Sequence, residues 1–216
     1  MSENATLVTQ KHFDYLAERT VAEDTFLKEL KEAARQEGIP AIWINPAQAS
    51  FLQILLRLRG ARDVVEVGTL AGYSAIVMAR ALPKDGTVRS IELLDKHAAF
   101  AEEWISRSDV AGRVEVLRGA GADVLATLPD ESADAAFLDA DKGGYPVYLE
   151  HCMRILRPGG LMMADNAFAF GQLFDETPSD GEVGAVRAFN DIIAKQHGLQ
   201  SVIVPMGDGC WVGVKV

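Results

Sequence analysis

The 216-residue sequence has only two cysteines, no long hydrophobic run and no excess of positive charge. Cys152 and Cys210 stand alone and match no paired zinc spacing, so they give no support for a zinc site. No apolar run approaches the roughly 20 residues that a bilayer requires. No basic, then apolar, then small-residue signal opens the chain. We therefore expect a cytoplasmic protein with no membrane segment.

Charge and composition narrow the function classes. Lys and Arg number 21 and Asp and Glu number 31, so the formal net charge is −10. That balance disfavours nucleic acid and anionic lipid as partners, although a local basic patch would still be compatible with them. With 49% hydrophobic and 24% charged residues, the composition is that of a globular protein and excludes disordered, collagen-like and coiled-coil classes. The length favours a single domain over residues 1–216.

From about residue 61 onward, short β-rich runs alternate with longer amphipathic stretches. The predicted strands are Asp63–Val67, Thr87–Glu92, Arg113–Leu117, Ala133–Leu138, Gly160–Ala164, Gln200–Val204 and Cys210–Val216. The predicted helices between them are Tyr73–Leu82, Asp95–Ser108, Ala122–Leu128, Gly144–Leu156 and Gly184–Gln196. This alternation indicates an α/β protein with a mostly parallel sheet and helices on both faces. Residues 205–209 are too few for a crossover helix, so the last two strands should form an antiparallel C-terminal hairpin at one side of the sheet.

Residues 1–60 are predicted to form a mostly helical segment before the core of residues 61–216. The first helical stretch, His12–Glu37, is charged and amphipathic and is followed by glycine and proline. The second, Asn45–Arg59, opens with an Asn-Pro pair that fits an N-cap and a first helical position. A lid, a dimer surface and simple packing all stay open as roles for these extra N-terminal helices.

The first predicted strand leads into a glycine-spaced turn with Glu66, Gly68 and Gly72. Glycines let a ligand approach the backbone, and ligands of open α/β sheets bind at the carboxyl ends of the strands. The dinucleotide spacing is absent and the Glu66 carboxylate would repel a pyrophosphate, which disfavours a nicotinamide dehydrogenase. Glu92 ends the second strand, where such sheets hold ribose hydroxyls. S-adenosylmethionine, a nucleoside with a sulfonium and no phosphate, fits both acids; a buried glycine turn without a ligand is the alternative.

Oxygen-bearing side chains follow the fourth and fifth predicted strands. Asp139 and Asp141 come after the fourth strand, and Asp165 and Asn166 come after the fifth. Two carboxylates and an amide offer only oxygen ligands, which favour Mg²⁺, with Ca²⁺ or Mn²⁺ as alternatives, over zinc. Because neighbouring strand side chains point to opposite faces, Asp165 and Asn166 can face one ion only if the chain has already left the strand. The alternative is that these residues form turns and caps.

Lys142 lies three residues after Asp139, within reach of the same ion. A lysine is a poor base while it is protonated, and a neighbouring divalent cation disfavours the protonated form. Lys142 is therefore the candidate general base that removes a hydroxyl proton. An ion pair with Asp139 or Asp141 is a nearly equal interpretation.

With these residues in place, the sequence resembles the cation-dependent class I O-methyltransferases, the caffeoyl-CoA and catechol O-methyltransferase family and its bacterial relatives. The similarity runs from about residue 45 to the end, and the motifs in combination are more specific than any one of them. They are Glu66-Val-Gly-Thr-Leu-Ala-Gly-Tyr-Ser74, Asp139-Ala-Asp-Lys-Gly-Gly-Tyr145, Arg157-Pro-Gly-Gly160, Asp165-Asn166, Arg187-Ala-Phe-Asn190 and Gly207-Asp-Gly209. The resemblance implies a Rossmann-like seven-stranded methyltransferase sheet and a homodimer.

The resemblance also implies roles for single residues. The metal ligands would be Asp139, Asp165 and Asn166. Lys142 occupies the place of the general base in the catechol branch, which makes it the catalytic partner of Asp139. The donor contacts would come from Ile44, Glu66, Gly68, Thr69, Ser74, Glu92, Gly121 and Asp141.

The sequence departs from the family pattern in three places. The turn before the second helix carries Gln48-Ala49-Ser50 where relatives usually have a glycine, a change that leaves donor binding largely intact. Residues 167–171 replace a Leu-Trp-x-Gly pattern, and residues 143–144 replace an acid and an asparagine. These last two departures alter the acceptor side, so the resemblance assigns no plant-type substrate.

We therefore predict an S-adenosylmethionine-dependent, divalent-metal-dependent O-methyltransferase. Its acceptor would be a catechol-like vicinal dihydroxy aromatic small molecule, because a lone hydroxyl cannot chelate an ion. Phe168–Val183 is the predicted acceptor loop, with phenylalanines to stack on a ring and acids to repel a coenzyme A thioester; a solvated loop is the alternative. Two other functions stay open, a hydroxyuridine O-methyltransferase acting on tRNA and a non-catalytic S-adenosylmethionine-binding protein.

Overall fold

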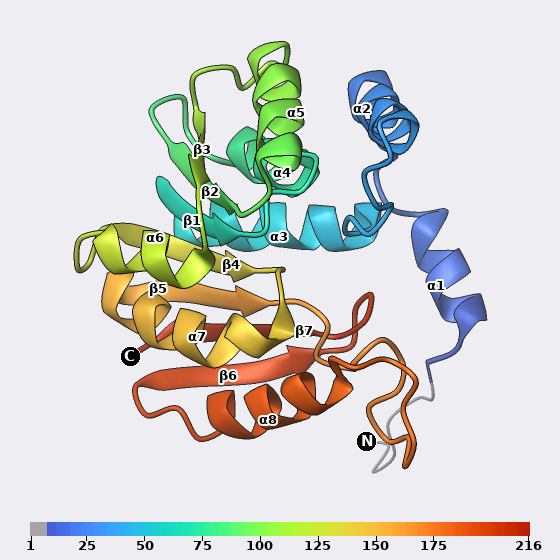
Figure 1. Cartoon of the computed structure of the whole chain (residues 1–216), viewed down its shortest axis with the longest axis vertical. Coiled ribbons are helices and arrows are strands. Elements are labelled where there is room, and N and C mark those ends of the chain that lie inside the picture. Colours follow the sequence, from blue (N-terminus) through green and yellow to red (C-terminus); the bar gives the residue numbers. More distant parts are fainter. Residues whose placement is uncertain (1–7) are drawn as a thin grey trace.

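A computed structural model describes residues 8–216, which contain a seven-stranded sheet in the order β3-β2-β1-β4-β5-β7-β6 (Figure 1). The strands are β1 (Asp63–Val67), β2 (Thr87–Glu92), β3 (Val114–Arg118), β4 (Ala133–Leu138), β5 (Leu156–Ala164), β6 (Leu199–Val204) and β7 (Cys210–Lys215). Strands β1 to β5 pair in parallel, whereas β7 is antiparallel to both β5 and β6. The predicted Rossmann-like sheet with an antiparallel C-terminal hairpin is confirmed. The hairpin inserts its second strand, so β6 rather than the last strand forms the edge.

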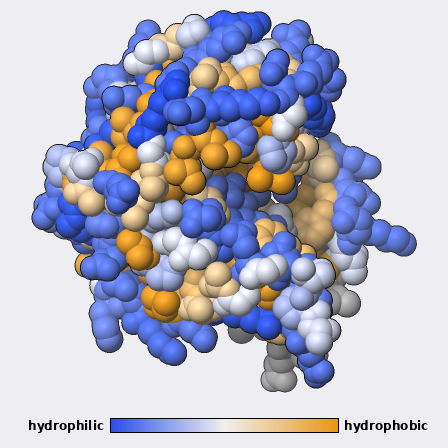
Figure 2. All heavy atoms as spheres, in the orientation of Figure 1, coloured by the Kyte–Doolittle hydropathy of each residue, from blue (hydrophilic) through white to orange (hydrophobic). Residues whose placement is uncertain are grey.

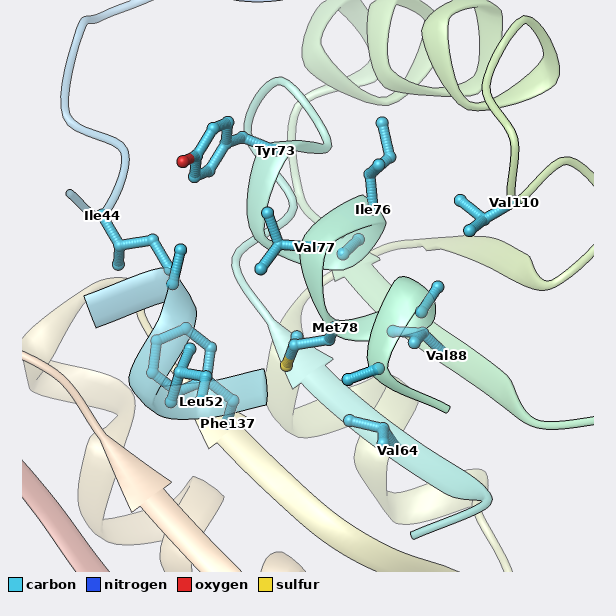
Figure 3. Close-up of a cluster of buried hydrophobic side chains, with 14 of the residues drawn as sticks. Ile44, Leu52, Val64, Tyr73, Ile76, Val77, Met78, Val88, Val110 and Phe137 are labelled. Atoms are coloured by element: carbon cyan, nitrogen blue, oxygen red, sulfur yellow. The ribbon is translucent and has the colours of Figure 1, made fainter. Parts of the chain in front are cut away.

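Helices cover both faces of the sheet because the central strands carry apolar side chains on both faces. The helices are α1 (Gln10–Ala17), α2 (Thr25–Gln36), α3 (Pro46–Arg59), α4 (Tyr73–Ala81), α5 (Asp95–Ser106), α6 (Gly121–Thr127), α7 (Tyr145–Ile155) and α8 (Val183–Ile193), with a 3₁₀ turn η1 (Lys142–Gly144). Val64 of β1 packs in one cluster with α2 to α5, and its neighbour Val65 packs in the other with α6 to α8. Figure 3 shows part of the first cluster, where Leu52 lies beside Phe137 and Met78 points from α4 toward α3. Side chains that point alternately to the two faces of a sheet buried on both sides thus build two cores.

Several predicted boundaries differ from the structure. The stretch His12–Glu37 is not one helix but two, because Asp24 starts a new helix by accepting a hydrogen bond from the Leu27 backbone N–H at 2.9 Å. Strand β5 begins at Leu156, four residues earlier than predicted, since the Arg-Pro-Gly-Gly stretch is already extended. Strand β3 is shifted by one residue toward the C-terminus.

The parallel strands bring several chemically important segments to one rim of the sheet. The carboxyl ends of β1, β2, β4 and β5 lead respectively to Gly68, Leu93, Asp139 and Asp165. None of the helices between residues 8 and 216 combines the length and hydropathy that crossing a membrane requires. The cytoplasmic location expected from the sequence stays a prediction.

Candidate functional site

The carboxyl-end rim of the sheet opens into a cavity of about 740 Å³, within the range of roughly 300–1,000 Å³ in which proteins hold small ligands. Its walls come from the turn after β1, the residues after β2 and β4, the start of α6 and the segment before α3. Figure 2 shows a hollow near the middle of this face, with hydrophobic residues along its upper side. The cavity therefore lies at the glycine turn that the sequence predicted as a ligand site.

Most of the residues predicted to contact the donor line this cavity. They are Ile44, Gly68, Thr69, Ser74, Glu92, Gly121 and Asp141. The exception is Glu66, which is fully buried behind the cavity wall. The structure thus brings together residues from five separate segments of the chain, as the predicted donor site requires.

Gly68 is required by the geometry of the turn after β1. Its φ is +106°, and a Cβ at this position would lie 1.9 Å from the backbone oxygen of Asp139. No other residue fits such a close approach between the ends of β1 and β4. The neighbouring Thr69 hydroxyl lies 2.6 Å from the Ser90 hydroxyl of β2, which ties the turn to the adjacent strand.

Glu92 is held rigidly at the end of β2. Its two carboxylate oxygens accept hydrogen bonds from the backbone N–H groups of Leu70, at 2.8 Å, and Leu94, at 2.9 Å. The side chain is buried but still faces the cavity. Each oxygen keeps a second lone pair for ribose hydroxyls.

Glu66 has a different environment. Burial raises its pKa to about 8, and hydrogen bonds from Ser74 and Ser90 offset only part of this effect. Its Oε1 is the one fully buried side-chain oxygen or nitrogen in residues 8–216 with no hydrogen-bond partner. A cationic ligand in the adjacent cavity would favour the ionised carboxylate, which fits the charge argument made from the sequence.

Asp141 is oriented by two contacts. The Tyr148 hydroxyl donates to its Oδ1 at 2.7 Å, and the Gly144 backbone N–H donates to its Oδ2 at 3.0 Å. Tyr148 also packs where a Cβ on Gly121 would lie, 2.8 Å from its ring. Tyr148 therefore contacts two of the residues predicted to bind the donor, Asp141 and Gly121.

The three predicted metal ligands lie directly after neighbouring parallel strands. Asp139 follows β4, and Asp165 and Asn166 follow β5. Strand β5 ends at Ala164 and Asn166 has a φ of +64°, so the chain has left the strand as the sequence argument required. The Asn166 Nδ2 donates to Asp208 Oδ2 at 3.1 Å, which leaves its amide oxygen without a side-chain donor.

This donor set fits a divalent cation. Burial and mutual repulsion raise the pKa of Asp165 to about 7, and burial also raises the pKa of Asp139 although Lys142 opposes it. A buried carboxylate and a half-buried one at close range are costly unless a positive charge lies between them. Within residues 8–216 no third Asp, Glu, His or Cys completes the group, so Asn166 would supply the third oxygen.

Lys142 is buried and lines the cavity beside these ligands. Its Nζ lies 3.4 Å from Asp139 Oδ1 and donates to the Tyr145 hydroxyl at 2.7 Å. Burial holds the pKa of Tyr145 well above its usual range, so the phenol stays neutral and donates to the Leu138 backbone oxygen at 3.0 Å. The ion pair considered from the sequence therefore exists, and it holds Nζ at the cavity.

The predicted acceptor loop meets the cavity through two of its residues, Phe170 and Glu182. Glu182 Oε1 accepts a hydrogen bond from the Lys142 backbone N–H at 3.0 Å. Phe174 is 92% exposed and does not line the cavity, whereas the Phe168 ring packs against Gly209. Only part of the loop can contact an acceptor in this conformation.

Sequence reasoning missed four residues that shape the site: Gln48, Tyr145, Tyr148 and Asp208. Spacing along the chain would have indicated the two tyrosines. Tyr148 lies seven residues after Asp141 and donates to it, and Tyr145 lies three residues after Lys142 and accepts from it. Gln48 and Asp208 come from distant segments and contact the metal residues only through tertiary structure.

Comparisons with known proteins agree with this geometry. The O-methyltransferase family profile matches residues 17–216. A catechol O-methyltransferase of Niastella koreensis is 38% identical over 204 residues, which span 93% of this chain and 90% of that relative.

Two solved structures share the fold over most of the chain. An O-methyltransferase from Bacillus cereus, solved in complex with S-adenosylhomocysteine, is 33% identical, covers 94% of this chain and 96% of its own, and has a TM-score of 0.85. The O-methyltransferase TomG from Streptomyces achromogenes, in complex with S-adenosylmethionine, is 30% identical with coverage of 97% and 100% and a TM-score of 0.82. The chain belongs to the O-methyltransferase family and is an S-adenosylmethionine-dependent enzyme.

Proposed function

We propose that this enzyme is divalent-cation-dependent and methylates one hydroxyl of a catechol-like vicinal dihydroxy aromatic small molecule. The observation that carries the proposal is the grouping of Asp139, Asp165 and Asn166 at one rim of the sheet, next to a lysine in the donor cavity. The name of the Niastella koreensis relative supports the same acceptor class. Mg²⁺ is the expected ion, with Ca²⁺ and Mn²⁺ as alternatives, because every ligand is an oxygen.

Different side chains have different roles in the proposed reaction. When bound, a divalent cation supplies positive charge that lowers the pKa of a nearby hydroxyl. The rim residues Asp139, Asp165 and Asn166 would hold that cation, and the wall from Ile44 to Asp141 would hold the donor. Holding the reacting groups in contact, at about 3 Å, removes much of the entropic part of the barrier.

Lys142 would take the proton. Freed from its ion pair with Asp139 when a cation is bound there, Lys142 would act as a neutral amine and accept the hydroxyl proton while the acceptor oxygen bonds to the donor methyl carbon and the carbon–sulfur bond breaks. The neutral phenol of Tyr145 keeps the amine at the cavity wall. The Phe170 ring offers an apolar surface for the acceptor at the same wall.

We also propose that the enzyme is a homodimer. All residues of α1 are exposed or only partly buried in the single chain, and an isolated helix of this length is unstable in water. Ile54 and Leu58 of α3 add exposed apolar surface, at 52% and 80% exposure. A second copy would cover these surfaces.

An acceptor screen tests the proposed substrate. Labelled donor is incubated with Mg²⁺ and one of three acceptors: catechol, phenol or RNA that carries 5-hydroxyuridine. Methyl transfer to catechol alone is the expected result, because phenol cannot chelate and the chain carries ten excess negative charges. Transfer to the RNA alone would replace the small-molecule proposal with the tRNA alternative, and equal transfer to phenol would contradict chelation.

A further inference from the structure

Gln48 is a buried polar side chain that the proposed reaction does not use. It lies in the first turn of α3, is 2% exposed, and its Nε2 donates to Asp165 Oδ1 at 2.6 Å. The two residues are 117 positions apart, so this contact joins the N-terminal helical segment to the end of β5. We propose that Gln48 is a positioning residue that fixes Asp165 for cation binding, an inference that rests on the proposed function.

The contact fixes the rotation of the Asp165 carboxylate. Oδ1 is occupied by the Gln48 amide, and Oδ2 accepts no side-chain hydrogen bond from residues 8–216. An ion can therefore bind Oδ2 or the second lone pair of Oδ1. Because Asp165 is itself 8% exposed, water cannot readily replace the amide donor.

Gln48 is held in place on both sides. Its backbone N–H donates to the Asn45 side-chain oxygen at 2.9 Å, which sets the start of α3. A Cβ on Gly207, in the turn between β6 and β7, would lie 2.8 Å from the Gln48 Oε1, so glycine leaves room for the amide there. The helix start and the turn thus define one position for the Gln48 side chain.

The same turn also holds the neighbouring metal residue, since Asp208 accepts from the Asn166 amide. Asp165 and Asn166 are therefore each oriented by one outer contact, the first from α3 and the second from the β6–β7 turn. Mutation of such outer contacts commonly lowers metal affinity about 10- to 100-fold. Gln48 consequently makes the N-terminal segment part of the cation site.

Mn²⁺ titration of metal-free protein by isothermal titration calorimetry tests this inference. The variant is Gln48→Met, which keeps the length of the side chain and removes the donor. The matched control is Gln53→Met on the same helix, because Gln53 Nε2 donates to the Val77 backbone oxygen at 2.8 Å, away from the rim. The Mn²⁺ dissociation constant should rise about tenfold or more in Gln48→Met and stay within about twofold in the control.

Two further measurements separate positioning from folding. The affinity for S-adenosylhomocysteine and the melting temperature should be similar in the two methionine variants. If Gln48→Met does not fold, Gln48→Asn replaces it, since the shorter amide cannot reach Asp165 and should show the same loss of Mn²⁺ affinity.

The outcomes distinguish the inference from the proposed function. If the wild-type protein binds no Mn²⁺, the proposed cation dependence fails. If the wild type binds Mn²⁺ and the folded Gln48 variant binds it equally well, or if Gln53→Met loses as much affinity, Gln48 does not position Asp165.

Discussion

At the scale of single residues, Lys142 is the proposed acceptor of the hydroxyl proton. Replacing it with methionine should lower kcat for catechol by about 100-fold or more, because the proton has no acceptor at the site. The loss should be much smaller for 4-nitrocatechol, whose more acidic hydroxyl needs less help to ionise. Initial rates with both acceptors at saturating donor measure this difference.

The control for this variant is Lys215→Met, whose lysine donates to the Leu156 backbone oxygen at 2.6 Å and lies outside the cavity. It should keep wild-type rates with both acceptors. An equal loss for catechol and 4-nitrocatechol in Lys142→Met would mean that the lysine does not act as the base.

Glu66 makes the stability of the ligand-free protein depend on pH. Burial raises its pKa from the usual 4.5 to about 8, so the folded state holds a proton that the unfolded chain releases above pH 4.5. The free energy of unfolding should therefore fall as pH rises from about 5 to 8, by an amount on the order of a few kcal/mol from this group.

The substitution Glu66→Gln removes this contribution of Glu66 to the pH dependence of stability. Urea unfolding at pH 5 and pH 8 should show a smaller fall in the free energy of unfolding for the variant than for the wild type. Identical pH slopes in the two proteins would show that Glu66 is ionised in the folded state throughout this range.

Single residues also show what sequence reasoning can reach. The shared rim of Asp139, Asp165 and Asn166 could be predicted because strand ends of a parallel sheet lie together, whereas their binding of an ion stays a prediction. The left-handed backbone of Asn166, which lets the pair leave the strand, could not be predicted, since it follows from tertiary contacts of its side chain with Asp208. Gln48 was noted only as a departure from the family pattern, and its contact appears once α3 is docked.

At the scale of elements, the turn between β1 and α4 is expected to tolerate substitution poorly. Gly68→Ala should cost several kcal/mol and abolish donor binding, because the new Cβ would overlap the Asp139 backbone oxygen. Gly112→Ala is the control: Gly112 also has a positive φ, +79°, but has open space around it. It should cost only about 1–2 kcal/mol. Urea unfolding and S-adenosylhomocysteine titration compare the two variants. Equal losses of free energy of unfolding would contradict the close approach between Gly68 and the Asp139 backbone.

The β6–β7 turn holds the loop that follows β5. Asp208 accepts hydrogen bonds from the backbone N–H groups of Phe170, at 2.7 Å, and Gly171, at 3.1 Å, as well as from Asn166. Asp208→Ala should destabilise the fold by about 1–3 kcal/mol and speed amide hydrogen exchange in residues 166–171. Asp191→Ala on the exposed side of α8 should do neither. Unchanged exchange in Asp208→Ala would show that the loop is held by other contacts.

Helices and strands differ in how well their bounds could be predicted from the sequence. The strand ends Val67, Glu92, Leu138 and Ala164 were predicted correctly, because apolar runs stop there at polar or glycine residues. The break between α1 and α2 was missed, since the amphipathic pattern continues across it. The placement of β7 inside the sheet depends on pairing between distant strands, which no local pattern specifies.

The whole molecule is expected to be a dimer. Sedimentation equilibrium should give twice the 23.4 kDa of the chain, and Leu58→Asp should shift the protein toward the monomer by placing a charge on the exposed apolar surface. A wild-type protein that stays monomeric at tens of micromolar would contradict the dimer. A dimer that Leu58→Asp leaves intact would place the interface elsewhere.

The direct measurement of the central claim is methyl transfer from S-adenosylmethionine to catechol by chelator-treated protein, with and without added Mg²⁺. If Asp139, Asp165 and Asn166 hold an ion that catalysis requires, the rate should fall to background after chelation and return when Mg²⁺ is restored. The Asp165→Ala variant should stay inactive with Mg²⁺ present while binding the donor within a few-fold of wild type. Full activity of the wild-type enzyme in the presence of chelator would contradict the account.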